Sequence, residues 1–546
     1  MKQQIDIMVP MADGISLACD IRYPNGDGPW PAILLRTPYN KNIPYNPNSK
    51  NVYLDDGYVY VTQDVRGKHE SRGEFQYLHE AQDGYDTIEW ISNQPWCNGR
   101  VGMIGGSYSG YAQLAAAKLK PPSLFGITPA VFTGNIFKGV DYKNGVPQMQ
   151  CLGWFIINYG RVCQAPTCDW QEAYEAVPLN TMDSVIGYNI PAFQENLKHP
   201  TYDDYWKAKS IEPCYDQLHA PTFLSGGWYD IFSIGLIRMY DDLFKSRTGN
   251  DSRSLKLLIG PWGHGLGTRK LGQLDFGPQA ELDLENLNKR WLDCFVKEAD
   301  DAIAKEPPVR IFVMGINEWR DEHEWPLSRA KDTYFYLNCS RSANSLFGDG
   351  ELSTEISDGK DFDTYLYNPE NPVPSIGNNT TSSSPCDHRP VERRDDVLVY
   401  TTTELTEELE VTGYIRLELC VSSTAVDTDF IGRLCNVFQD GRSINLCDGI
   451  FRMRFREGLD REVMMTPGET CQIEIDMEAT SNVFLPGHRI RLEITSSSFP
   501  RFAPNHNTGN PVATDCEFKT ATQTIYHSTQ HPSRLILPVI PSNDCE

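Results

Sequence analysis

The chain has 546 residues, 40% of them hydrophobic and 22% charged, and its formal net charge is −24. This length exceeds what one hydrophobic core supports, so two or three domains are expected. The acidic balance argues against nucleic acid as a partner, because binding phosphates needs a basic face, and it disfavours anionic membranes.

The N-terminus predicts a first strand of a domain and not a targeting segment. Residues 1–10 lack the apolar core of a secretory peptide, and no apolar run is long enough to span a bilayer. We therefore expect a cytoplasmic protein. Its 15 cysteines are scattered along the chain, which favours reduced thiols. Cys163 and Cys168 come nearest to a metal pair, but no second pair follows, so neither a metal nor another cofactor is expected.

Residues 1–131 alternate strand and helix patterns, which predicts the first part of a mostly parallel α/β sheet. Strands are expected at 31–36, 58–64 and 101–106, an amphipathic helix at 84–91, and a loop at 95–100.

The segment from Val101 to Ala112 is the most informative part of the chain. Apolar residues lead into Gly105-Gly106-Ser107, and helix-forming residues follow. This pattern predicts a strand, a sharp turn and a helix with Ser107 at the apex, as in the nucleophile elbow of serine hydrolases. The usual spacing is Gly-x-Ser-x-Gly, whereas here Ser109 takes the last position and Gly110 follows one place later. A glycine-rich turn that carries a serine by chance is the alternative.

The rest of the chain divides by pattern into three parts. Residues 132–212 mix short apolar helical stretches with polar segments and show no clear strand, which indicates a helical cap inserted over the sheet. Residues 213–330 resume the α/β core, with strands expected at 221–228, 255–260 and 309–314, a helix at 289–296 and a turn-rich connection after the last strand. Residues 331–546 contain short strands, including 397–401, 413–419 and 489–495, and predict a jelly-roll β-sandwich. Residues 372–385 are expected to form a surface loop. Residues 378–380 within this loop form an N-glycosylation sequon, but glycosylation is not expected in a protein that is not exported.

A serine nucleophile needs a histidine base and a carboxylate that orients it, in the chain order Ser, Asp, His for α/β-hydrolases. Asp230 and His264 each follow a predicted strand in this order. Asp230 as a helix cap and His264 as an ordinary packed histidine are the alternatives. The N–H of Tyr108 is one expected oxyanion donor. The Tyr39 hydroxyl is a candidate for the second, although the residues alone favour packing in a proline turn.

Several motifs together resemble the CocE/NonD hydrolase family, to which cocaine esterase-like enzymes, glutaryl acylases, α-amino-acid ester hydrolases and, more distantly, X-Pro dipeptidyl-peptidases are related. The matching stretches are 36–39, 64–67, 83–90, 105–110, 227–230, 260–264, 312–315, 318–320 and 427–430. The elbow of this family reads Gly-x-Ser-Tyr-x-Gly, so the late Gly110 is its normal form. The resemblance implies an α/β-hydrolase domain with a helical cap and a C-terminal jelly roll. It also implies a triad of Ser107, Asp230 and His264 with an oxyanion hole formed by Tyr39 and Tyr108.

The resemblance implies a serine hydrolase that cleaves a carboxylic ester, or an amide, of a small acyl group. Trp154 and Phe155 are candidates for the acyl pocket, with ordinary helix packing as the alternative. Acyl transfer to an amine or alcohol stays open, as does an X-Pro dipeptidyl-peptidase or aminoacyl-ester hydrolase. No carboxylate occurs at 231–234, and Asp203 and Asp204 favour a solvated face. A non-catalytic binding protein that uses the jelly roll is a further alternative. The oligomeric state stays open, and the expected partner is a small ester or amide.

Overall fold

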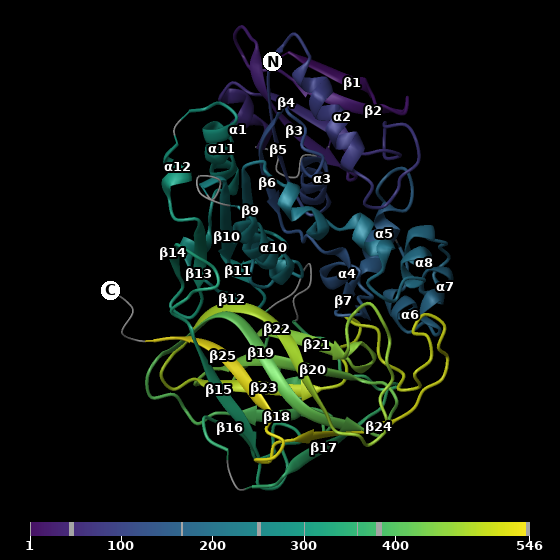
Figure 1. Cartoon of the computed structure of the whole chain (residues 1–546), viewed down its shortest axis with the longest axis vertical. Helices are drawn as coiled ribbons and strands as arrows, with labels where there is room; N and C mark the ends of the chain where they lie inside the picture. The colour runs from purple at the N-terminus through teal and green to yellow at the C-terminus, as the bar shows by residue number, and fades with distance from the viewer. Residues whose placement is uncertain are drawn as a thin grey trace.

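The computed structural model describes residues 2–42, 49–164, 167–247, 253–299, 301–356, 359–377 and 385–541. An α/β part and an all-β part stack along the long axis of the molecule, and short helices flank their junction (Figure 1). The sequon 378–380 and half of the expected surface loop lie outside the described residues. None of the described helices combines the length and the apolar character that crossing a bilayer requires.

The α/β part is built on one large sheet of strand order β1-β2-β4-β3-β5-β6-β9-β10-β13-β14. The strands from β4 to β13 in this order pair in parallel, while β1, β2 and β14 pair antiparallel at the two edges. The bounds are β1 Gln3–Pro10, β2 Ser16–Arg22, β3 Trp30–Thr37, β4 Val59–Asp64, β5 Cys97–Gly106, β6 Leu124–Ala130, β9 Thr222–Gly227, β10 Leu255–Gly260, β13 Val309–Val313 and β14 Glu318–Glu322. The predicted mostly parallel α/β sheet is therefore present.

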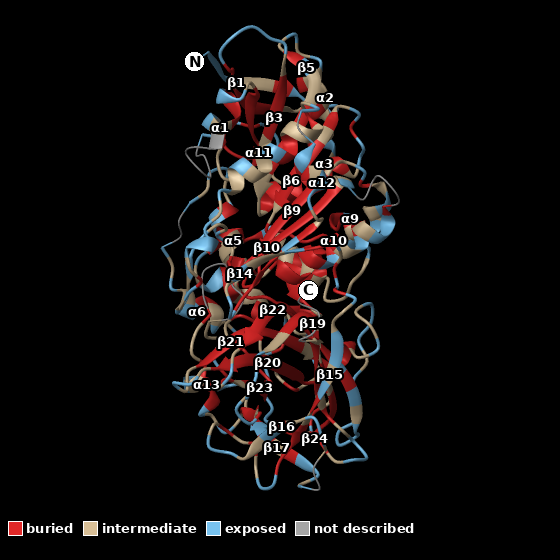
Figure 2. Cartoon of the chain, turned by 90° about the vertical axis from the view of Figure 1, so that its left-hand side faces the viewer, coloured by how far each residue is buried: buried red, intermediate tan, exposed pale blue. Residues whose placement is uncertain are grey.

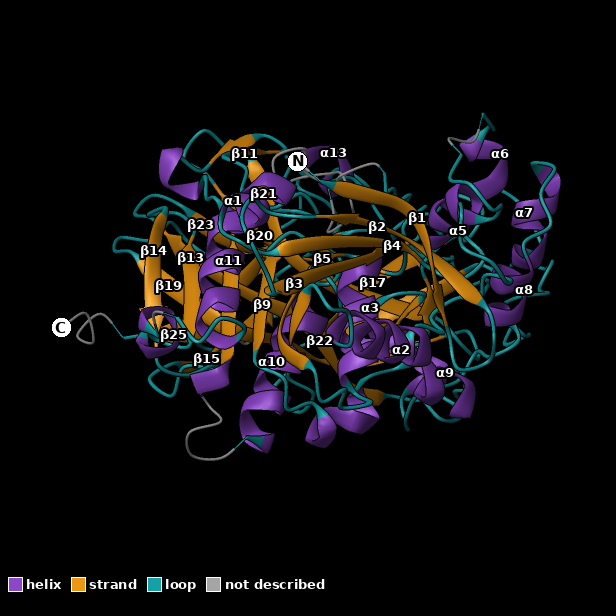
Figure 3. Cartoon of the chain, turned by 90° about the horizontal axis from the view of Figure 1, so that it is seen from above, coloured by secondary structure: helices purple, strands orange, loops and turns teal. Residues whose placement is uncertain are grey.

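Helices cover both faces of this sheet (Figure 3). On one face lie α2 (Ala81–Ser92) and α3 (Tyr108–Ala117), which contact each other. On the other face lie α1 (Ser49–Asp55) and α11 (Leu284–Phe295), where buried Trp291 packs in one cluster with Ile33 and Ile104 of the sheet. Because both faces are covered, the central strands β4, β9 and β10 are buried along their whole length.

The segment between β6 and β9, called the cap below, consists mainly of short helices. Its helices are α4 Ile136–Gly139, α5 Cys151–Asn158, α6 Trp170–Tyr174, α7 Met182–Val185, α8 Pro191–Leu197 and α9 Asp204–Lys209. Contrary to the expectation of no strand here, β7 (Tyr142–Lys143) and β8 (Val146–Pro147) form a short hairpin. Its turn is Asn144-Gly145, with both residues at positive φ, which is a strong hairpin signal. The buried Lys143 forms an ion pair with Glu478, so this hairpin holds the cap against the β domain.

The C-terminal part is all-β, as predicted, and its strands are mostly buried (Figure 2). Its main path is β17-β24-β19-β25-β15-β16-β18-β23-β20-β21, with β22 pairing to β19. The bounds are β15 Lys331–Asn338, β16 Gly350–Ser353, β17 Phe362–Tyr367, β18 Leu398–Thr401, β19 Leu409–Ser423, β20 Asp429–Val437, β21 Ser443–Arg452, β22 Cys471–Phe484, β23 Arg489–Thr495, β24 Ala521–Tyr526 and β25 Arg534–Ile540.

Two local predictions in the α/β part were wrong. The loop expected at 95–100 is strand from Cys97 onward, because Cys97 pairs with Trp30 before a bulge in the β3–β5 ladder. The turn-rich connection after β13 contains β14, which forms an antiparallel hairpin with β13. For Cys97 the pairing partner is distant in the sequence and decides the structure, whereas the partner of β14 is the strand directly before it.

Candidate active site

Ser107 sits at the sharp turn between β5 and α3. Its backbone has φ 56° and ψ −128°, a strained conformation for a residue with a side chain. The Ser107 N–H donates to the Ala130 carbonyl at 2.9 Å, which ties the turn to the end of β6. Tyr108 is the first residue of α3, so its N–H belongs to the orphan donors at a helix N-terminus. The turn therefore presents a hydroxyl beside a site suited to a developing negative charge.

The late glycine of the motif has a steric reason. A Cβ on Gly110 would lie 2.9 Å from the Ala130 carbonyl oxygen, so only glycine lets α3 pack this closely on β6. Gly105 has φ +131°, and a Cβ there would lie 2.6 Å from the Cβ of Ser109. Gly105 thus makes room for Ser109, which stands where the usual elbow has its glycine.

Asp230 and His264 come together because the turns after β9 and β10 are bonded to each other. Trp228 and Tyr229 donate backbone hydrogen bonds to the carbonyls of Gly260 and Trp262, both at 2.9 Å. The Nδ1 of His264 then lies 2.9 Å from Oδ1 of Asp230. A carboxylate only accepts, so Nδ1 carries the proton and Nε2 is left as the basic nitrogen.

Burial and charge oppose each other at His264. The side chain is 16% exposed and that of Asp230 is 1% exposed. Burial alone would lower the pKa of His264, but the charge of Asp230 and its hydrogen bond outweigh burial, so the pKa is raised above its ordinary value. The pair is therefore prepared to accept a proton and to stabilise the resulting imidazolium.

Ser107 and His264 line one cavity of about 110 Å³ between the core and the cap. Its wall is mostly apolar and aromatic, and Trp154 and Phe155 of α5 both belong to it. The other lining residues are Tyr77, Leu78, Tyr108, Phe132, Val140, Asp141, Gln148, Gln150, Cys151, Ile231 and Phe232. A hydroxyl and an imidazole therefore share one small cavity with a mostly apolar wall.

Asp141, which lines the cavity, is a buried acid that the sequence analysis did not predict. Asp141 is 6% exposed, and its Oδ2 accepts a hydrogen bond from the Tyr77 hydroxyl at 3.1 Å. Burial raises the pKa of Asp141 to about 7, against the charge of Lys209 and the bond from Tyr77. No local pattern marks this residue, because the folding of the cap brings it to the cavity.

Tyr39 lies in the loop after β3. Its hydroxyl accepts a hydrogen bond from Nε1 of Trp154 at 2.9 Å. Together with His264 and the backbone of Gly105 and Gly106, Tyr39 also lines a second cavity of about 390 Å³. His264 therefore lines both cavities, the smaller one with Ser107 and the larger one with Tyr39.

The aspartates and cysteines of the cap that the sequence analysis considered do not line the cavity of Ser107. Asp203 caps the N-terminus of α9 by accepting from the N–H groups of Tyr205 and Trp206, and Asp204 is fully exposed. Cys163 donates from its thiol to the Pro38 carbonyl at 3.2 Å. Neither Cys163 nor Cys168 forms a disulfide.

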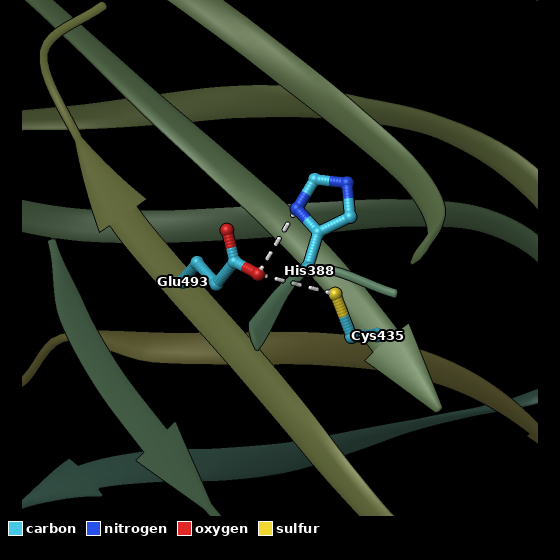
Figure 4. Close-up of side chains that lie close together, drawn as sticks. All are labelled: His388, Cys435 and Glu493. Carbon is cyan, nitrogen blue, oxygen red and sulfur yellow. Dashed lines mark hydrogen bonds and ion pairs between the residues drawn. The ribbon is translucent and has the colours of Figure 1, made fainter. Parts of the chain in front are cut away.

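Among the described residues, one group of three side chains of kinds that can ligate metals has its ligand atoms within 4.8 Å of one another (Figure 4). His388, Cys435 and Glu493 are buried in the β domain, with Nδ1 of His388 3.3 Å from Oε1 of Glu493 and the Cys435 thiol 3.5 Å from the same oxygen. The other oxygen of Glu493 accepts a 2.5 Å hydrogen bond from Arg433. Because a guanidinium already neutralises the carboxylate, this set is built as an ion-pair network, and it lies in the β domain away from Ser107.

Comparisons with known proteins agree with this architecture. Residues 13–266 match the family model of the X-Pro dipeptidyl-peptidase (S15 family), and residues 301–536 match the X-Pro dipeptidyl-peptidase C-terminal non-catalytic domain. The cocaine esterase of Rhodococcus sp. (strain MB1 Bresler) is 38% identical over 568 aligned positions, which cover 98% of each chain.

Two solved structures cover nearly the whole chain. An aminopeptidase from the marine sediment archaeon Thaumarchaeota archaeon has a TM-score of 0.86 at 26% identity, over 99% of this chain and 96% of its own. An α-amino acid ester hydrolase has a TM-score of 0.87 at 25% identity, over 98% of this chain and 96% of its own. With the fold, the elbow and these relatives in agreement, the chain belongs to the CocE/NonD family and is an ester hydrolase of that type.

Proposed function

We propose that the chain cleaves a carboxylic ester, or an amide, of a small acyl group through a covalent acyl-enzyme on Ser107. The observation that carries this proposal is that His264, whose Nδ1 is bonded to Asp230, lines one cavity together with Ser107. His264 Nε2 takes the hydroxyl proton as Ser107 attacks the carbonyl carbon, and then gives that proton to the leaving group. Water then attacks the acyl-enzyme, with His264 again taking and giving a proton, and the carboxylic acid is released from Ser107.

The negative charge that forms on the substrate oxygen needs donors already in place. The Tyr108 N–H at the start of α3 and the Tyr39 hydroxyl are the proposed pair. The volume of about 110 Å³ and the aromatic wall with Trp154 and Phe155 support a small acyl group. No other partner is proposed.

Ser107→Ala tests this function most simply. The variant should lose hydrolysis of p-nitrophenyl acetate and labelling by a fluorophosphonate, while its thermal unfolding stays like that of the wild type. Ser109→Ala is the matched control, because it removes the neighbouring hydroxyl of the same elbow and should retain both properties. Labelling that survives in Ser107→Ala would overturn the assignment.

Asp141 favours a second candidate function, in which the acyl group of the substrate carries an amine, as in an α-amino acid ester. The charge of Lys209 offsets the burial of Asp141 only in part, because the pKa of Asp141 stays raised at about 7, so an ammonium group in the cavity would further stabilise the carboxylate. Two of the solved relatives are an aminopeptidase and an α-amino acid ester hydrolase. Because the pKa of Asp141 is about 7, an ammonium group should bind more tightly as pH rises through this value.

Comparing p-nitrophenyl esters of alanine and of propionic acid separates the two candidates, since they differ by the amine. In the second candidate, Asp141→Asn raises KM for the alanine ester and leaves KM for the propionyl ester unchanged. Equal effects on both esters would leave the amine without a role.

A further inference from the structure

We propose that Trp154 is a positioning residue of the oxyanion hole, because its indole holds both residues that form it. The indole N–H donates to the Tyr39 hydroxyl at 2.9 Å. The indole ring also stacks on the ring of Tyr108, with centroids 5.4 Å apart and planes 10° from parallel. One side chain of the cap therefore contacts both the loop after β3 and the start of α3. This inference rests on the proposed function and goes beyond a lining role for Trp154.

The chemistry of the Trp154–Tyr39 bond decides what it does. An indole nitrogen can only donate, so the Tyr39 oxygen must accept through a lone pair and its own proton is not used in this contact. A hydroxyl that accepts one hydrogen bond becomes a better donor in the next. The contact therefore fixes the Tyr39 oxygen and strengthens its O–H toward a developing oxyanion.

The Tyr108 ring on which the indole stacks is itself held firmly. The Tyr108 hydroxyl donates to Oε1 of Glu80 at 2.9 Å and accepts from the N–H of Leu78 at 3.1 Å. Glu80 in turn pairs with Arg36 at 3.0 Å, and both side chains are buried. The indole thus rests on a ring that is anchored to the core through a buried ion pair.

Two other bonds tie the cap segment that carries Trp154 to the core, one of them beside Tyr39. Lys68 Nζ donates to the Asn158 carbonyl at 2.8 Å, which holds the end of α5. Beyond that helix, the Cys163 thiol donates to the Pro38 carbonyl at 3.2 Å, one residue before Tyr39. These contacts leave the indole little freedom to move relative to the phenol, as positioning requires.

A double-mutant cycle on kcat tests the inference. Trp154→Phe keeps a ring and removes the N–H donor, and Tyr39→Phe removes the hydroxyl that this donor holds. In the wild-type background we expect Trp154→Phe to lower kcat for p-nitrophenyl acetate about fivefold to tenfold, the worth of one neutral hydrogen bond. In the Tyr39→Phe background the same change should lower kcat less than about twofold, because the hydroxyl is already absent. Equal factors in both backgrounds would overturn the inference.

Phe132→Leu is the matched control, since Phe132 lines the same cavity and has no polar atom to bond to Tyr39. It should change kcat by the same factor in both backgrounds. Titration of active sites with a fluorophosphonate normalises kcat to folded enzyme. If Trp154→Phe does not fold, Trp154→Leu replaces it in the cycle and is scored in the same way.

The series also separates this inference from the proposed function. Esterase activity that survives in Ser107→Ala would refute the proposed function itself. Activity that requires Ser107, with no coupling between Trp154 and Tyr39, would refute only the positioning role.

Discussion

Replacing Asp230 with asparagine keeps the shape of the side chain and removes its charge. In the wild type that charge outweighs burial and raises the pKa of His264. In Asp230→Asn burial acts without this opposition, so the pKa of His264 should fall below its ordinary value. The amide can also donate to Nδ1 and so place the proton on Nε2, which is the wrong tautomer for a base. We expect kcat/KM to fall roughly 10⁴-fold.

The assay is kcat/KM for p-nitrophenyl acetate as a function of pH. Activity needs neutral His264, so in the wild type it should decline as pH falls through the raised pKa, and in Asp230→Asn the decline should move to lower pH. Asp203→Asn is the control, because asparagine caps a helix as well as aspartate and this residue caps α9. A rate for Asp230→Asn within tenfold of the wild type, or an acid limb that does not move, would refute the reasoning.

Three further changes test other parts of the structure. Tyr39→Phe should cost about 2.7–4 kcal/mol of transition-state stabilisation, measured as kcat/KM, and a near-wild-type value would remove the hydroxyl from the mechanism. Gly227→Ala places a Cβ 2.2 Å from the Trp262 carbonyl oxygen, so it should lower the free energy of unfolding by about 1–3 kcal/mol and reduce kcat; an unchanged urea midpoint would contradict this. Burial opposes ionisation of Glu493, but His388 and Arg433 outweigh burial and hold the pKa of Glu493 at about 2. The ionised carboxylate therefore contributes stability that is complete above its unfolded pKa of about 4.3 and is lost as pH falls through about 2. Urea unfolding of Glu493→Gln should therefore depend less on pH between these values than the wild type does.

The sequence predicted those parts of the site that local patterns record. Ser107 follows a strand and opens a helix, and Asp230 and His264 follow strands whose carboxyl ends lie at one edge of a parallel sheet. Chain order and strand ends were enough to bring these three residues together as candidates.

Features that depend on how the cap packs were beyond such patterns. Asp141 reaches the cavity, and Trp154 reaches Tyr39, only after the cap has folded over the core. In the β domain, His388 and Glu493 lie about a hundred residues apart in the chain and meet only when the domain has folded. The Asn144-Gly145 hairpin is different, because its Asn-Gly turn signal is local and can be recognised in the sequence.

The central claim is that the acyl group passes through Ser107. Rapid acid quench of the wild-type enzyme with p-nitrophenyl acetate, followed by peptide mass analysis, tests it directly. We predict one acetyl group on the peptide that contains Ser107 and none on that peptide in Ser107→Ala. An acetyl group on a different residue, together with turnover that survives in Ser107→Ala, would contradict the claim.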